Sequence, residues 1–303
     1  MNARVVAAVL GAALVLATGL AATADAASRV VFTKKSLYRN IMVTDEGDRI
    51  CLTFRLQNGQ VHALQSCMLK EKHDELVFEY SRAVMAGLLV VPSPKRILVL
   101  GLGGGSLPRV YRALLPAVPV DVVEIDEAVV QVARDWFDFK AGGSVKVHLK
   151  DGRQFVKQAG VFGQSYDLIV LDAFNGDYIP EHLMTREFLE ECKRILAPGG
   201  VLVANTFSSS RLYDSESATY AAVWGRFINL KREDGNRIIL ARNGAPLALD
   251  KLRAAVPTVG PSLVRFGVDL DEVLGDARAA PDWDPKAKVL TDDWNPANVM
   301  RGR

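Results

Sequence analysis

The sequence predicts an α/β protein whose main domain is a doubly wound, parallel sheet, preceded by a small N-terminal β-domain. Three observations lead to this prediction. From residue 95 onward, apolar runs of strand length alternate with stretches of helical character. A glycine-rich loop at 101–105 joins the first of these runs to the first helical stretch. Residues 49–68, upstream of both, have the pattern of a β-hairpin. Alternating strands and helices form a parallel sheet with helices on both faces.

Length and composition are those of an ordinary globular protein. The 303 residues are 49% hydrophobic and 24% charged, enough for one large or two modest domains with a full core. Lys and Arg number 37 against 35 Asp and Glu, and the basic residues are scattered along the chain. Such a distribution does not indicate nucleic acid, so we expect a small-molecule partner.

The first 26 residues have the pattern of an export signal. Residues 5–20 are nearly all apolar, follow Arg4 and lead into the cleavage pattern Ala24-Asp25-Ala26. We therefore expect cleavage after Ala26 and an exported protein, periplasmic or secreted. The alternative is a retained anchor, but the apolar run is shorter than the roughly 20 residues of a comfortable membrane span. No second apolar span follows in the sequence, so we expect no membrane insertion after cleavage.

The chain contains three cysteines: Cys51, Cys67 and Cys192. The turn signal Asn58-Gly59 lies between two strand-like runs at 49–56 and 61–68. A two-residue turn would place Cys51 opposite Ser66, whereas a three-residue loop with a bulge would place it opposite Cys67. The sequence leaves open whether these two cysteines form a disulfide or are two small buried apolar residues. The chain has no C-x-x-C motif or His/Cys cluster that would indicate a metal.

Domain boundaries follow from the same patterns. Residues 74–89 have helical character, and Pro92-Ser93-Pro94 interrupts the chain before the alternation of strands and helices begins. We expect four segments: a signal peptide at 1–26, a β-hairpin domain with a linking helix at 27–92, an α/β domain at 93–280, and a turn-rich tail at 281–303 that lies over the sheet. Within the α/β domain, strands are predicted at 96–100, 120–124, 145–149, 166–171, 201–205, 227–231 and 237–241, and helices at 106–115, 127–137 and 181–196.

The loop after the first strand has the features of a nucleoside site. Gly101, Gly103 and Gly105 let the backbone pass close to a ligand, because glycine has no Cβ to block it. A phosphate-binding lysine of the G-K-[ST] type is absent, which argues against a P-loop. Glu124 ends the second strand at about the spacing of 20 residues expected for a carboxylate that accepts both ribose hydroxyls, and Asp126 is placed to share this role. The alternative is that both acids are solvated at a strand end.

The rest of the pattern separates adenosylmethionine from other nucleosides. Asp151-Gly152 follows the third strand, residues 166–172 form the fourth strand and its terminal Asp172, and Leu196-Ala197-Pro198-Gly199-Gly200 precedes the fifth. This ordered set resembles the class I adenosylmethionine-dependent transferases, a Rossmann-like fold. The resemblance implies that Asp151 lies at the adenine amino group and that Asp172 lies beside the sulfonium.

Within that class the chain resembles the spermidine synthase (polyamine aminopropyltransferase) family. The similar motifs are 36–41, Gln65-Ser66, Asp74-Glu75, which begins the family's linking helix, and residues 172–175 with Pro180 and Leu183. The resemblance implies an N-terminal β-domain packed on the doubly wound domain. It also implies transfer of an aminopropyl group from decarboxylated adenosylmethionine to putrescine, with release of methylthioadenosine. Pro180 would line the nucleoside site.

The chemistry of such a transfer requires a base, because an amine with a pKa near 10 is mostly ammonium at neutral pH. Asp172 is the residue we expect in this role. The acceptor side departs from the family pattern at Gly104 and Asn175, where the family has aspartates, and at 78–80, which is Phe-Glu-Tyr. We therefore expect Asn175, with Asp177 or Glu79, to contact the acceptor, and Glu181 is a further acid able to supply the lost charge. The family glutamine is replaced by Arg39, which disfavours a cationic donor and suits the carboxylate of adenosylmethionine itself.

Three functions remain open from the sequence. The first is an aminopropyltransferase acting on a small-molecule amine. The second is a methyltransferase that uses adenosylmethionine at the same site. The third is a nucleoside-binding relic without catalysis. His182, at a predicted helix start, is either an auxiliary base near Asp172 or a half-exposed first-turn residue. A homodimer is compatible with the sequence.

Overall fold

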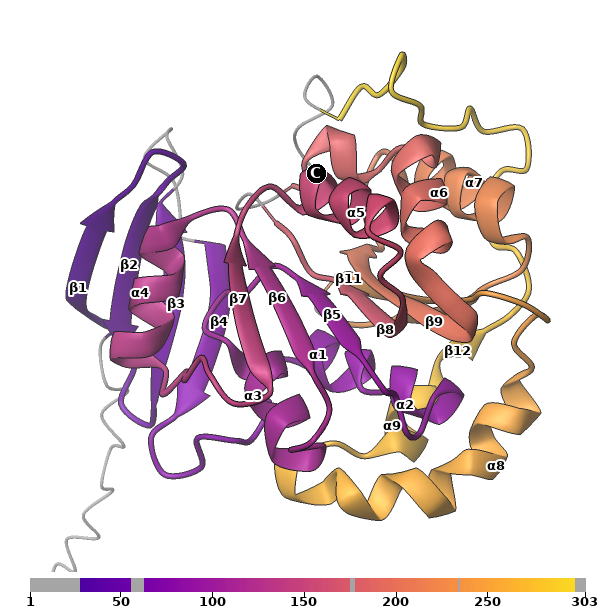
Figure 1. Cartoon of the computed structure of the whole chain (residues 1–303). Helices are drawn as coiled ribbons and strands as arrows, with labels where there is room; N and C mark the ends of the chain where they lie inside the picture. Colours follow the sequence, from indigo (N-terminus) through magenta and orange to yellow (C-terminus); the bar gives the residue numbers. More distant parts are fainter. Residues whose placement is uncertain (1–27, 56–62, 175–177, 234, 298–303) are drawn as a thin grey trace, which may run out of the picture.

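The protein contains two β-sheets, as the sequence predicts. The structure is a computed structural model that describes residues 28–55, 63–174, 178–233 and 235–297. One sheet has four strands in the order β1-β2-β3-β4, and the other has eight in the order β12-β10-β11-β9-β8-β5-β6-β7. The small sheet stands at the left of Figure 1, with the larger sheet and its helices to the right. The predicted fold class is therefore confirmed.

The N-terminal sheet is an antiparallel meander of β1 (Arg29–Lys35), β2 (Asn40–Asp45), β3 (Arg49–Arg55) and β4 (Ala63–Leu69). Ile41, Leu52 and Met68 turn one face of it into the core shared with the larger sheet. The turn signal at 58–59 lies outside the described residues. A register shift after Leu52 places Cys51 opposite Cys67, so the bulged pairing is the one that forms.

The linking segment is not the single helix that we predicted at 74–89. It consists of α1 (Glu79–Val84) and α2 (Gly87–Val90). The Arg82 side chain donates hydrogen bonds to the backbone oxygens of Leu76 and Val77, which stabilises an extended backbone before α1. At Gly87 a Cβ would lie 2.8 Å from the Val203 side chain, so α2 passes closer to the sheet than a longer residue would permit.

The larger sheet has a parallel part and an antiparallel edge. The parallel strands are β5 (Ile97–Leu100), β6 (Val120–Glu124), β7 (Val145–Leu149), β8 (Tyr166–Leu171) and β9 (Leu196–Phe207). The antiparallel strands are β10 (Ile228–Lys231), β11 (Asn236–Arg242) and β12 (Ala277–Arg278). Strand order reverses where β5 lies between β6 and β8, and ligands of such sheets bind beyond the carboxyl ends of the strands at this point.

Helices cover both faces of this sheet (Figure 1). On one face pack α3 (Ser106–Leu114), α4 (Glu127–Trp136), α8 (Leu249–Val259) and α9 (Leu270–Gly275), together with α1, α2 and the short turns η2 (Gly260–Ser262) and η3 (Val264–Phe266). On the other pack α5 (Gly152–Val161), α6 (Arg186–Ile195) and α7 (Tyr213–Trp224). Along β5, Leu98 faces the second group and Val99 the first, as a strand's alternation requires.

The predicted helix at 181–196 divides in the same way as the linking segment. A short turn, η1 (Glu181–Leu183), comes first, and α6 starts after Thr185. The Thr185 hydroxyl accepts a hydrogen bond from the Phe188 amide and donates one to Asp292 at 2.7 Å. This capping residue fixes the helix start, and the sequence analysis did not recognise it.

The C-terminal tail lies on the sheet, as predicted, only at its start, where Asp282 binds Lys231 of β10 at 2.7 Å; beyond that point it packs on helices. Asp292 binds the Arg153 guanidinium of α5 at 2.7 Å, and the same guanidinium binds Glu191 of α6. The Leu290 amide donates to Thr219 of α7. Paired side chains at these points hold the tail across α5 to α7, along the top of Figure 1. In the described residues, no helix has both the length and the apolar character needed to span a membrane.

Candidate active site

A cavity of about 260 Å³ opens at the carboxyl ends of β5, β6 and β8, where β3 and β4 of the N-terminal sheet also reach it. Of the predicted nucleoside residues, six line it: Gly101, Gly103, Glu124, Asp151, Gly152 and Pro180. The predicted base Asp172 lines it as well. The structure thus brings together residues more than 70 positions apart in sequence at the point of strand reversal, the place where this fold class binds ligands.

Two glycines of the loop are required by their backbone and by space. Gly101 has φ +99°, and a Cβ there would lie 2.1 Å from the Asp172 carbonyl oxygen. Gly105, with φ +77°, caps the start of α3, and a Cβ there would meet the Phe139 ring at 2.6 Å. Gly105 is not part of the cavity lining. Its role in this structure is to let the loop turn into α3 against Phe139.

Glu124 is buried at the end of β6 with both oxygens oriented by backbone amides. One oxygen accepts from the Leu102 amide at 3.2 Å and the other from the Asp126 amide at 3.0 Å. Burial raises the pKa of this carboxyl, and the two amides and the charge of Arg39 oppose the rise. Each oxygen retains lone-pair capacity beyond its one backbone bond, as bidentate binding of a ribose diol requires.

Asp126 does not line the cavity, although we predicted that it shares the ribose. Its carboxylate accepts from the Ala128 amide, which caps α4, and from the Ser36 hydroxyl at 2.6 Å. The Arg39 Nε lies 3.7 Å away. Asp126 therefore ties the segment before β2 to the start of α4, and it lies beside the Arg39 guanidinium.

Asp151 forms a pair with His182 in the wall of the cavity. The His182 Nε2 and the Asp151 Oδ2 are 2.8 Å apart, and the Gln154 amide donates to the other carboxylate oxygen at 2.9 Å. The hydrogen bond with His182 is the main reason that the pKa of Asp151 is lowered. His182 lines the cavity, is half-exposed in the turn at 181–183 and binds Asp151, so of the two alternatives the half-exposed first-turn residue is the one that the structure shows.

Asp172 follows β8 and has two neutral hydrogen-bond donors. Asn205, near the end of β9, donates to its Oδ1 at 2.9 Å, and Tyr80 of α1 forms a second hydrogen bond. Burial raises the pKa of Asp172 to about 7, although both hydrogen bonds act to lower it. A carboxyl with this pKa is partly ionised at neutral pH, where it can take a proton from an ammonium.

Arg39 lies in the cavity wall near Glu124. Its Nη1 donates to the Phe174 carbonyl at 3.1 Å, and its guanidinium lies 4.4 Å from the centre of the Phe54 ring. Its Nε is buried without a hydrogen-bond partner. The replacement of the family glutamine thus introduces a positive charge into the wall, stacked on an aromatic ring and balanced in part by Asp126.

The predicted acceptor residues have mixed outcomes. Asn175 and Asp177 lie outside the described residues. Glu79 is exposed, and neither it nor Glu181 lines the cavity. At Gly104 a Cβ would lie 2.7 Å from the Ser66 hydroxyl and 2.9 Å from the Phe137 ring, so other side chains fill the space of the family aspartate.

Sequence reasoning missed the importance of Tyr80 and Asn205. Tyr80 was visible only as a departure from the family pattern. Asn205 ends a predicted strand, and a polar residue at the carboxyl end of a buried strand was a signal that we did not use. In the described part of the chain, no three His, Cys, Asp or Glu side chains gather in a way that could hold a metal ion.

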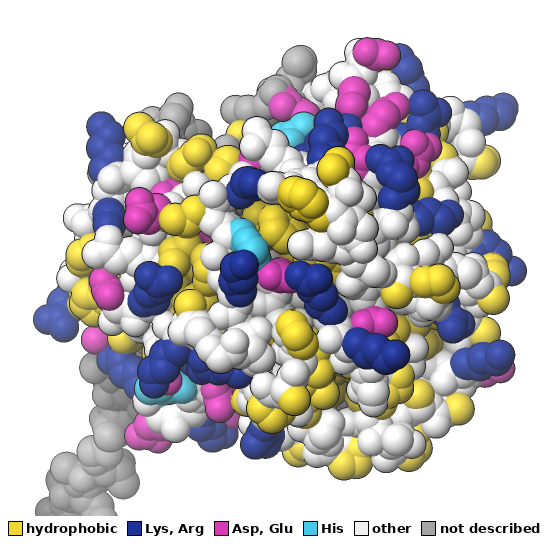
Figure 2. Space-filling view, in the orientation of Figure 1, with side chains coloured by type: hydrophobic (Ala, Val, Ile, Leu, Met, Phe, Trp, Pro, Cys, Tyr) yellow, Lys and Arg dark blue, Asp and Glu magenta, His cyan; other side chains and the backbone are white. Residues whose placement is uncertain are grey.

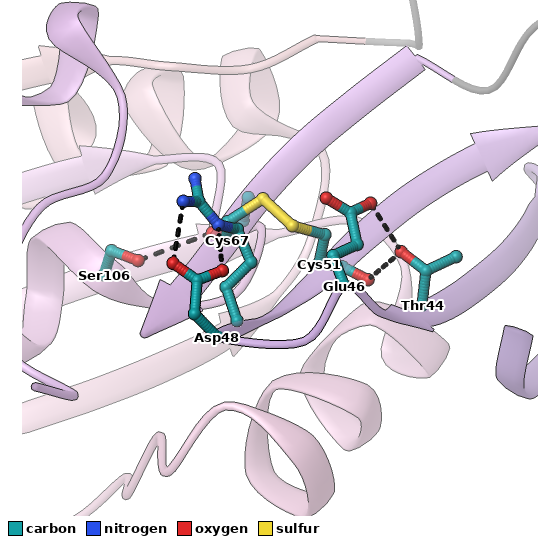
Figure 3. The surroundings of a disulfide bond; sticks show 8 residues. Thr44, Glu46, Asp48, Cys51, Cys67 and Ser106 are labelled. Carbon is teal, nitrogen blue, oxygen red and sulfur yellow. Dashed lines mark hydrogen bonds and ion pairs between the residues drawn. A yellow bond between two sulfur atoms is a disulfide. The ribbon is translucent and has the colours of Figure 1, made fainter. Parts of the chain in front are cut away.

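The two cysteines of the hairpin form a disulfide at the edge of this cavity. Cys51 and Cys67 are bonded across β3 and β4 with their Cα atoms 4.1 Å apart, and Cys67 lines the cavity. Figure 3 shows the bond with Thr44 and Glu46 on the Cys51 side and Ser106 on the Cys67 side. The hydroxyls of Ser66 and Ser106 are 3.4 Å apart, so the bridged strand packs against the start of α3.

A doubly wound sheet preceded by an antiparallel sheet, with buried Glu124 and Asp172 lining a cavity at the point of strand reversal, defines a protein with the Rossmann-like fold of methyltransferases. Known proteins specify which one. A model of the spermine/spermidine synthase domain matches residues 77–226. A polyamine aminopropyltransferase of Vibrio vulnificus is 44% identical over 277 residues, covering 90% of this chain and 92% of that protein. The chain belongs to the spermidine synthase (polyamine aminopropyltransferase) family, and it is a transferase.

Solved structures agree on the fold. A probable spermidine synthase from Corynebacterium glutamicum aligns with a TM-score of 0.63 at 24% identity, over 85% of this chain and 98% of that one. Human methyltransferase-like protein 13, in complex with SAH, aligns with a TM-score of 0.57 at 28% identity, over 62% of this chain and 93% of that one. The same fold thus occurs in proteins named as a probable spermidine synthase and as a methyltransferase-like protein.

Proposed function

We propose that the protein transfers the aminopropyl group of decarboxylated adenosylmethionine to a small primary amine. The observation that carries this proposal is Asp172, a carboxyl of pKa about 7 directly beside the loop that would hold the nucleoside. Family membership supports the donor. Glu124 would bind the ribose and the Asp151–His182 pair would face the adenine, which leaves Asp172 for the reacting amine.

The reaction needs alignment and one proton transfer. The acceptor ammonium gives its proton to the Asp172 carboxylate, and the free amine nitrogen attacks the aminopropyl carbon bonded to sulfur. A carbon–nitrogen bond forms as the carbon–sulfur bond breaks, and methylthioadenosine leaves with the sulfur electron pair. The leaving group is already cationic, so the protein supplies position and a base rather than an acid.

The test is the release of methylthioadenosine from decarboxylated adenosylmethionine in the presence of an amine. We expect Asp172→Asn to lower kcat by about 10²- to 10⁴-fold, the range of general-base catalysis, with nucleoside affinity nearly unchanged. Wild-type protein that binds methylthioadenosine and yet turns over no amine would contradict the proposal.

Methyl transfer from adenosylmethionine is the second candidate, and Arg39 is the observation in its favour. A guanidinium in the cavity wall suits the carboxylate that adenosylmethionine has and its decarboxylated form lacks. The likeness to the human methyltransferase structure supports the same alternative. Incubation with each donor separates the two, because methyl transfer releases adenosylhomocysteine and aminopropyl transfer releases methylthioadenosine.

Export is the remaining part of the proposal. The N-terminal pattern supports it, with Ala27 as the first residue of the mature chain. The Cys51–Cys67 disulfide supports it as well, since such bonds persist in oxidising compartments.

The partner that we propose is a small-molecule amine. On the face drawn in Figure 2, Lys and Arg side chains are interspersed with acidic and apolar ones.

A further inference from the structure

Apolar and neutral groups form part of the cavity wall, joined to Asp172 through Tyr80. Val77, Phe78 and Tyr80 line it from the segment around α1, and Phe54 and Cys67 line it from the N-terminal sheet. The Phe78 and Tyr80 rings are stacked with their centres 5.8 Å apart, and Tyr80 is hydrogen bonded to Asp172. We call the space bounded by Val77, Phe78, Tyr80, Phe54 and Cys67 the distal chamber.

Each acidic side chain that lines the cavity already has hydrogen-bond partners or a role in the reaction. Among the described residues that line it, the acids are Glu124, Asp151 and Asp172. Glu124 accepts two backbone amides beside Arg39, and Asp151 is paired with His182. Asp172 accepts hydrogen bonds from the neutral side chains of Asn205 and Tyr80, and the reaction uses it for the amine that becomes alkylated.

Positive charge is already present next to the distal chamber. The Arg39 guanidinium covers the Phe54 ring at 4.4 Å, so that aromatic face is occupied by a cation. A diamine such as putrescine would place a second ammonium in this region. That ammonium would lose its hydration and meet neither a carboxylate among the described residues nor a free Phe54 face, a costly arrangement.

We propose that the acceptor is a primary amine with a single cationic end and an apolar or aromatic body, which occupies the distal chamber while its amine meets Asp172. This inference rests on the proposed aminopropyl transfer and narrows its substrate class. An alkyl or aryl body gains by burial against Val77 and Phe78, whereas a second charge does not.

The test compares a diamine with two monoamines, one of which differs from it only at the far end. Putrescine and n-pentylamine have the same number of heavy atoms, and n-pentylamine has a methyl where putrescine has its second ammonium; 2-phenylethylamine supplies an aromatic body. Methylthioadenosine release and the mass of the alkylated amine give kcat/KM for each. We expect both monoamines to exceed putrescine by about tenfold or more, the scale of leaving one desolvated charge unpaired.

Calorimetry on protein saturated with methylthioadenosine measures acceptor binding without turnover. Tighter binding of n-pentylamine than of putrescine supports the inference, whether or not aminopropyl transfer is detected. Failure of the proposed function appears in the turnover assay alone, so the two outcomes are distinguishable. Equal or tighter putrescine binding overturns the inference and leaves the proposed function standing.

Two variants locate the effect. Phe78→Glu introduces a carboxylate into the chamber and should shift the preference toward putrescine by about tenfold or more. Phe78→Leu removes the ring without adding charge and should leave n-pentylamine preferred. Asp177 lies outside the described residues, and the variant Asp177→Asn tests directly whether its carboxylate binds the second ammonium of putrescine. If Asp177→Asn weakens putrescine binding and leaves n-pentylamine unchanged, Asp177 holds the far ammonium and the inference is wrong.

Discussion

The side-chain amide of Asn205 donates to Asp172 at 2.9 Å, and its carbonyl oxygen accepts from Asn236 at 3.0 Å. The second bond fixes the orientation of the first, because an amide that accepts from Asn236 must present its NH₂ group to Asp172. Asn205 is buried between the two partners. A neutral donor in a fixed orientation stabilises the carboxylate of Asp172 without adding a charge to the cavity.

Asn205→Ala should move the pH profile of the enzyme. Loss of the donor raises the pKa of Asp172 further above its usual range, since the hydrogen bond to Asn205 opposes the effect of burial. We expect the rising limb of kcat/KM to shift by about half a unit to one unit toward higher pH. Asn236→Ala, which leaves the donor in place but frees it to turn, should shift the profile in the same direction by less. Lower activity with an unmoved profile would show that Asn205 acts by packing alone.

Glu124→Ala should weaken methylthioadenosine binding by about tenfold or more, the value of a charge-assisted bond to a hydroxyl pair. Calorimetry measures it. The matched control is Glu127→Ala, because Glu127 is an exposed acid in the first turn of α4, three residues further along the chain. Equal affinities in the two variants would mean that Glu124 serves only the backbone amides of Leu102 and Asp126.

Local pattern was sufficient for the strands that carry the site. Strands β6, β7 and β8 have the predicted ends, because apolar, mostly β-branched runs interrupted by polar loops define buried strands. Helices α5, α7, α8 and α9 were not predicted, and one helix was predicted at 74–89 and one at 181–196 where the structure has a break in each. The start of α6 depends on Thr185, whose hydroxyl bonds to Asp292 of the tail, a tertiary contact that no local window contains.

The same distinction applies to the site. Gly101 and Asp172 directly follow the strands β5 and β8, and Glu124 ends β6. Their positions in the site could therefore be predicted from their positions in the sequence. Asn205 meets Asp172 only because β8 and β9 pair with Leu171 opposite Ala204, and Tyr80 arrives from α1 in a different part of the chain. At Gly104 φ is not positive, and the constraint on a larger residue is the space taken by Ser66 and Phe137, which the sequence alone does not reveal.

Removal of the disulfide should lower stability. Cys51 and Cys67 are 16 residues apart, and a bridge over such a loop contributes about 3 kcal/mol by constraining the unfolded chain. We expect a lower Tm for the Cys51→Ala, Cys67→Ala double variant. Addition of reductant should lower the Tm of the wild type and leave that of the double variant unchanged. A wild-type Tm that is insensitive to reductant, with the thiols shown to be free, would argue against a stabilising bridge.

Export predicts a defined N-terminus. Signal cleavage after Ala26 gives a mature chain that starts at Ala27. The intact mass of protein recovered from the envelope fraction of the expressing cells measures this directly. Ala26→Pro, next to the cleaved bond, should block processing and retain the full-length mass, and Ala22→Ser is a matched control away from the cleavage site. Recovery of full-length protein from the cytosol alone would contradict export.

Asp172 should reduce the stability of the folded protein as the pH rises. Its pKa is about 7 in the folded chain and near 3.8 in the unfolded chain. Below both values the group is protonated in both states and has no effect on stability. Between them the unfolded chain has released the proton that the folded chain still binds, so the free energy of unfolding falls with rising pH and levels off above pH 7.

Asp172→Asn removes this dependence because its amide does not titrate. At pH 8 we expect the variant to be more stable than the wild type by about 1 to 3 kcal/mol, a difference that disappears near pH 4. Urea unfolding at both pH values measures it. Asp177→Asn, made outside the described residues, serves as a control for the loss of one acid. Asp172→Asn should be more stable and less active than the wild type at pH 8. Burial makes Asp172 a base near neutral pH, and the same burial makes its charge unfavourable in the folded protein. Equal stabilities at pH 8 would mean that the pKa of Asp172 is near its usual value and that it is a weaker base than the reaction requires.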